Sequence, residues 1–211
     1  MKKEEMLKEN FINMKIEYQV NHHKTSRAID TVFSDELKHF KSLLINFNNE
    51  YNCIDNTQID LIVNGSNGLK DIFNSCKVIL IEDYESRFNN HMEELSKTMY
   101  DFFIRKLNND NIKSSSKHIN KHLVELCKFD FFLIQDKLEN KLIEFGNDFV
   151  YRYVNSEDAR RDFDDIIRKI NYTLVCNLKK TMKDSIDDKQ DIAARYNTLN
   201  KKVILSNELV R

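Results

Sequence analysis

Two histidines have the spacing of a metal site. His118 and His122 stand four residues apart, and Glu125 follows one helical turn later. On a helix both imidazoles share a face, where they could bind zinc with the carboxylate as a third ligand. The motif H-E-x-x-H is absent, and an exposed polar face beside a loop accounts for the same spacing. We favour the polar face and expect no metal and no other cofactor.

Other pairs of chemistry-bearing residues are incomplete. Glu36-x-x-His39 supplies one half of the di-iron bundle pattern, which needs two such pairs and two further glutamates. Arg87 and His91 share a helix face, and we interpret them as a surface pair. The segment NGSNG at 64–68 is too short to hold a phosphate and predicts a turn. Because no spacing singles out a catalytic group, we favour a non-enzymatic protein over an enzyme.

Basic residues gather between positions 105 and 122, where Asp110 is the single acid. The bases are Arg105, Lys106, Lys113, Lys117 and Lys121. They fall at a predicted turn between two helices, so one end of the bundle is expected to carry a basic tip. Such a tip could bind the phosphates of nucleic acid or of lipid headgroups. A solvated hairpin end is the alternative.

Phenylalanines flank this basic segment on both sides. They are Phe102, Phe103, Phe129, Phe131 and Phe132. Neighbouring residues differ by about 100° around a helix, so adjacent phenylalanines require a wide apolar face. A thick core and an interface with another protein, or with a second copy of this one, explain that face equally well.

The elements that must position these residues are helices. The 211 residues include no proline and three glycines, so few residues interrupt a helix. Apolar residues recur at steps of three and four, which is typical of amphipathic helices. The pattern predicts helices at about 3–52, 57–64, 68–108, 116–154 and 157–207. Two polar stretches, at 21–27 and 183–191, interrupt the apolar stripes. The alternatives to continuous helix are a kink, an exposed turn or a short break at the first stretch and a break at the second.

Turn chemistry predicts the helix ends. Asp55 or Asn56 is expected to cap the short helix, and Gly65 to close it in a left-handed conformation. Ser66 or Asn67 is expected to cap the next helix. Ser156, followed by two acids, is expected to begin the last one.

Together these features predict an all-α fold, an elongated antiparallel bundle of about four long helices in a single domain over 1–211. A coiled-coil rod formed with partner chains is the alternative. The net charge is −1, which argues against a global affinity for nucleic acid. No apolar run is long enough to span a bilayer, and the amino terminus lacks the apolar region of a signal peptide.

The four cysteines are widely separated, so we expect buried or half-buried thiols in the cytoplasm. We therefore predict a helical protein–protein interaction module that acts through apolar and aromatic helix faces. Its partner would be another protein, itself, or both. The alternatives are a nucleic-acid-binding regulator that uses residues 105–122 and a membrane-surface helical module.

Overall fold

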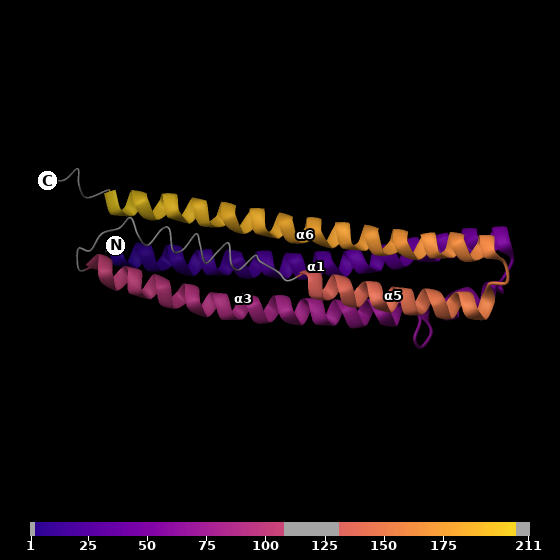
Figure 1. Ribbon diagram of the computed structural model, residues 1–211. Helices are drawn as coiled ribbons and strands as arrows, with labels where there is room; N and C mark the ends of the chain where they lie inside the picture. Colours follow the sequence, from indigo (N-terminus) through magenta and orange to yellow (C-terminus); the bar gives the residue numbers. More distant parts are fainter. Residues whose placement is uncertain (1–2, 108–130, 206–211) are drawn as a thin grey trace. The chain divides into compact units, whose positions relative to one another are not determined.

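The computed structural model describes residues 3–107 and 131–205, and these residues form helices joined by short connections (Figure 1). The helices are α1 (Lys3–Tyr51), α2 (Asn56–Asn64), α3 (Leu69–Leu107), α5 (Phe131–Tyr153) and α6 (Glu157–Leu205). The predicted all-α class with four long helices is confirmed, and the described residues contain no strand. Helix predicted for 116–130 lies outside them. No helix in the described ranges has an apolar stretch long enough to cross a membrane.

Both polar stretches, at which a break was the alternative to continuous helix, are helical throughout. Residues 21–27 lie within α1, and residues 183–191 lie within α6. The predicted helices 3–52 and 157–207 therefore continue through both stretches, and a break at either one is excluded. The physical reason appears in the tertiary structure, where polar side chains from both stretches are buried rather than looped into solvent.

The helix ends follow the expected chemistry at two of the predicted caps. Asp55 caps α2: its carboxylate accepts a hydrogen bond from the Thr57 backbone at 3.1 Å, and the Gln58 side chain accepts from the Asp55 backbone at 2.9 Å. Ser156 caps α6, since its hydroxyl accepts from the Ala159 backbone at 3.1 Å. These bonds satisfy backbone N–H groups that a helix start leaves without partners.

The turn after α2 differs from the prediction. Gly65 has φ −73° and ψ 172°, an extended conformation, and the left-handed residue in this turn is Asn67, at φ 64°. A Cβ at Gly65 would lie 2.4 Å from the Leu61 carbonyl oxygen, so close backbone approach is what requires glycine here. The carbonyl of Gly68, not a Ser66 or Asn67 side chain, accepts the first hydrogen bond of α3.

The chain packs as two compact units. Of the described residues, unit 1 contains 3–26, 83–107 and 182–205, and unit 2 contains 27–82 and 131–181. The prediction of one domain over 1–211 stays a prediction.

Unit 2 is built around aromatic contacts between α1, α5 and α6. Phe149 stacks on Phe163 with ring centroids 3.9 Å apart, and Phe47 meets Phe163 edge-on at 5.3 Å. Phe40 contacts Phe145 at 5.8 Å, which packs α1 against α5. The short connection at 154–156 returns the chain, so α6 runs antiparallel to α5 (Figure 1).

Unit 1 has its own apolar core from α1, α3 and α6. The cluster contains Met14, Tyr18, Phe88, Met92, Ile192, Ala193 and Tyr196, with Phe11 packed against it. Asn10 donates to Asn200 at 2.9 Å and Asn21 donates to Asp188 at 3.2 Å, so α1 and α6 run antiparallel in this unit.

The described cysteines correct one expectation. Cys76 is buried and Cys53 is half-buried, as predicted, but Cys176 is exposed on α6. It lies between the stripe positions Leu174 and Leu178, both fully buried, so the helix turns it outward. All three are free thiols; Cys127 lies outside the described residues.

Candidate interaction face and the buried polar layer

The residues predicted as a basic tip and aromatic face fall at the edge of the described structure. Phe102, Phe103, Arg105 and Lys106 lie on the helical backbone of α3, and Phe131 and Phe132 begin α5; none of their side chains is described. Lys113, Lys117, Lys121 and Phe129 lie outside the described residues, as do His118 and His122. The basic tip, the aromatic face and the histidine pair therefore stay predictions.

Glu36 and His39 form a structural contact in unit 2. Glu36 is buried; its Oε2 lies 3.3 Å from His39 Nδ1, and its Oε1 accepts a hydrogen bond from Asn177 at 3.0 Å. Within the described ranges no group of three or more histidine, cysteine or acidic side chains could hold a metal. The carboxylate of Glu36 is thus satisfied by α1 and α6 themselves.

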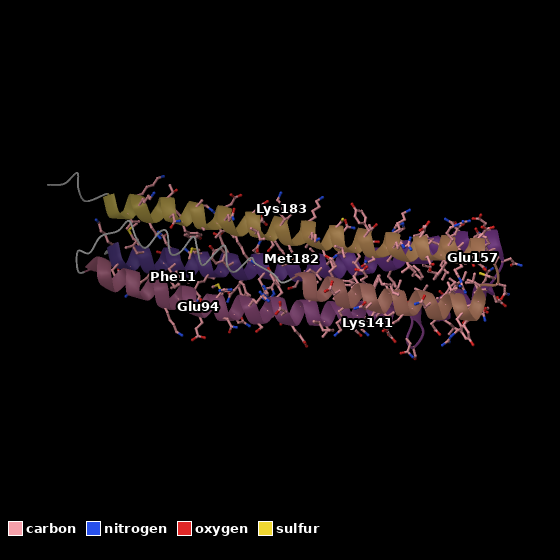
Figure 2. All side chains as sticks on the ribbon, viewed as in Figure 1. Phe11, Glu94, Lys141, Glu157, Met182 and Lys183 are labelled. Atoms are coloured by element: carbon pink, nitrogen blue, oxygen red, sulfur yellow. The ribbon has the colours of Figure 1, made fainter. Side chains whose placement is uncertain are left out.

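The two polar stretches of α1 and α6 meet inside unit 1 and form a buried polar layer. We define this layer as Asn21, His22, Thr25, Tyr84, Ser185 and Lys189, each at most 5% exposed. Thr25 donates to Ser185 at 2.7 Å, and Ser185 donates to the Asn21 side chain at 3.0 Å. Figure 2 labels Met182 and Lys183, where the polar stretch of α6 begins; Met182 is buried and Lys183 is exposed.

Lys189 holds the only charged group of this layer. Its Nζ donates to the Tyr84 hydroxyl at 2.8 Å and to Ser185 at 3.3 Å. The same ammonium lies 4.9 Å from the centroid of the Tyr84 ring and 5.8 Å from that of Phe88, at cation–π distances. No described carboxylate forms an ion pair with it. Polar hydroxyls and aromatic faces therefore replace the counter-ion.

His22 lies between aromatic rings. Its ring stacks on Tyr84 at 4.5 Å and on Phe88 at 4.2 Å, and its Nδ1 has no hydrogen-bond partner in the described structure. Burial, the positive charge of Lys189 and the neighbouring His23 together lower the pKa of His22 from 6.5 to about 4, and burial is the largest of the three causes. The imidazole is therefore neutral at physiological pH.

This polar layer determines which face of α1 points outward. A pair of helices that share only apolar contacts can slide or rotate at small cost, whereas a buried hydrogen bond is lost when its partners move apart. The hydrogen bonds that join Asn21 and Thr25 on α1 to Ser185 on α6 fix both the register and the rotation of α1 against α6 in unit 1. The side chains on the opposite face of α1 must then face away from that core.

Three apolar side chains occupy this opposite face, which we call the α1 stripe: Ile12, Ile16 and Val20. They are 56%, 51% and 48% exposed. Ile16 stands two residues from both Met14 and Tyr18, about 200° around the helix from each, so it points away from the core they share. Steps of four residues place all three on one line. A row of exposed β-branched residues marks a surface suited to association.

A groove of about 330 Å³ borders the stripe at Val20, between α1 and α6. At its edge Arg195 forms an ion pair with Glu17 at 2.5 Å, and the Tyr196 hydroxyl donates to the same carboxylate at 2.7 Å. The Tyr196 hydrogen bond lowers the pKa of Glu17, while burial and Glu17 raise the pKa of Tyr196 to about 12. These contacts join α1 to α6 beside the groove.

Sequence reasoning missed both features although the signal was present. Tyr18, His22, Thr25 and Ile29 keep the three- and four-residue steps of the buried face of α1, and Met182, Ser185, Lys189 and Ile192 keep those of the buried face of α6. Polarity led those positions to be interpreted as interruptions. The α1 stripe was missed because Leu7, Phe11 and Met14 already accounted for an apolar face.

Comparisons with protein-family models, with curated proteins and with solved structures find no match for this chain.

Proposed function

We propose that this protein is a non-enzymatic helical interaction module that binds a partner protein through the α1 stripe. The observation that carries the proposal is the exposure of Ile12, Ile16 and Val20 on one line of a helix whose opposite face is packed. Burying such a row against another apolar helix face removes it from water, and anchors at i, i+4 and i+8 are a recurring mode of helix recognition.

The chemistry of the described interior supports this function over catalysis. The hydroxyl and ammonium groups of the buried polar layer form hydrogen bonds with one another and with the Asn21 side chain. A reducing compartment, the cytoplasm, is part of the proposal, and the free thiols of Cys53, Cys76 and Cys176 agree with it.

The test compares two glutamate substitutions at equally exposed isoleucines. Ile16→Glu places a charge in the centre of the stripe, and Ile143→Glu, on α5 in unit 2, is the control because Ile143 is 48% exposed. A partner captured by the wild type is identified by mass spectrometry, purified and titrated against all three proteins. Binding lost in Ile16→Glu and kept in Ile143→Glu is expected; equal binding by all three would refute the proposal.

Chromatography with light scattering, read at two ultraviolet wavelengths, addresses the alternatives. Nucleic acid that co-elutes with the purified protein and is removed by salt would favour the basic segment 105–122 as the functional site. Co-sedimentation with anionic vesicles would favour a membrane-surface module.

A further inference from the structure

The residues around Ile16 repeat in mirror order along α1. Four positions before and after it stand Ile12 and Val20, both β-branched and about half exposed. Seven positions before and after it stand Glu9 and His23, an acid and an imidazole, both exposed. At about 100° per residue these five side chains occupy an arc of about 80°. The outer face of α1 is therefore complementary to the same face of a second copy that runs antiparallel to it.

From this order we infer that the partner of the α1 stripe is a second copy of this chain, paired antiparallel with a two-fold axis at Ile16. This inference rests on the proposed function and specifies its partner. A two-fold contact pairs residue i with j and j with i. Ile16 then meets its own copy, Ile12 meets the other Val20, and each Glu9 meets the other His23.

Charge and hydrogen bonding favour this arrangement over a parallel one. A parallel pair would set Glu9 against Glu9 across the interface, and like charges that face each other are unfavourable. In the antiparallel pair an imidazole N–H can donate to the carboxylate whether or not the ring is charged. Asn13 and Gln19 stand three positions before and after Ile16. In the antiparallel pair the amide of each Asn13 therefore lies beside the amide of the other copy's Gln19, at the edge of the interface.

The contact cannot form within one chain. Glu9 and His23 are fourteen residues apart on one continuous helix, about 21 Å at 1.5 Å per residue. Any energetic coupling between them therefore reports a contact between copies. Three apolar side chains per copy make less than the roughly 1,000 Å² of a stable interface, so the dimer is expected to be weak and reversible.

Sedimentation equilibrium of the full chain from roughly 5 to roughly 500 µM tests the inference. We expect a monomer–dimer equilibrium that Ile16→Glu weakens about 10-fold or more and that Ile143→Glu leaves unchanged. Glu9→Lys and His23→Glu should each weaken it several-fold, and the double variant, which restores an opposite-charge pair, should recover most of the loss. Circular dichroism establishes that every variant keeps its helices.

Three results would overturn the inference: a wild-type monomer at all concentrations, a dimer that Ile16→Glu does not weaken, or a double variant no better than the worse single one. These failures differ from failure of the proposed function. If the protein is a monomer that still binds another protein through Ile16, the inferred dimer is refuted and the proposed interaction function is not.

Discussion

Acidification should destabilise this protein through His22. The folded state holds this imidazole between the Tyr84 and Phe88 rings, with the Lys189 ammonium nearby, and its pKa falls from 6.5 to about 4. In the unfolded chain the ring is exposed to water and titrates with its ordinary pKa. Substituting His22 by Phe keeps a flat ring in the stack and removes the titrating group.

The sign and size of the effect follow from linkage. Above pH 6.5 the ring is neutral in both states, so the full stability is present. As the pH falls from 6.5 towards 4, the unfolded state binds a proton that the folded state does not, and the free energy of unfolding falls. With one pKa unit worth roughly 1.4 kcal/mol, the loss between neutral pH and a pH of five is roughly 2 kcal/mol.

Urea denaturation followed by circular dichroism at both pH values measures this loss. Other groups contribute to the pH dependence, so the quantity compared is the change in unfolding free energy between the two pH values in each variant. We expect His22→Phe to lose about 2 kcal/mol less than the wild type on acidification. Equal losses in His22→Phe and wild type would refute the burial argument.

Three further predictions concern single contacts. Lys189→Met should raise the free energy of unfolding by about 1 kcal/mol, because it removes a buried ammonium that has no described carboxylate partner. Urea denaturation measures this change, and a large loss of stability would contradict the prediction. Asp55→Ala should cost about 1 kcal/mol in the same assay through loss of the α2 capping box, whereas Asn56→Ala, which keeps the cap, should cost little. The hydrogen bond to Asp162 is the largest of several causes that raise the pKa of Tyr51 to about 12. In Asp162→Asn this pKa should therefore fall, as followed by tyrosinate absorbance; an unchanged titration curve would show that this bond does not form in solution.

Local chemistry made much of the fold predictable. Without proline, and with apolar residues at steps of three and four, the chain has little alternative to long helices. The helix ends that do not border undescribed residues lie within one residue of the predicted positions; these ends are Tyr51, Asn56, Asn64, Leu69, Tyr153 and Glu157. Asp55 and Ser156 were identified as caps because a side-chain oxygen at a helix start has one favoured partner, the free backbone N–H two or three residues later.

The candidate site could not be predicted from local sequence patterns, because it depends on contacts between distant segments. A polar residue at a stripe position is buried only if another element brings it a partner, and Ser185, 160 residues from Thr25 along the chain, is that partner. The sequence by itself determined that the chain is helical and where most described helices start and stop. Only the tertiary structure decided that the two polar stretches pack against one another. That contact fixes the rotation of α1 in unit 1, and therefore Ile12, Ile16 and Val20 face outward. Helix formation is governed by neighbours within a few residues, whereas the direction in which a helix face points depends on contacts between distant segments.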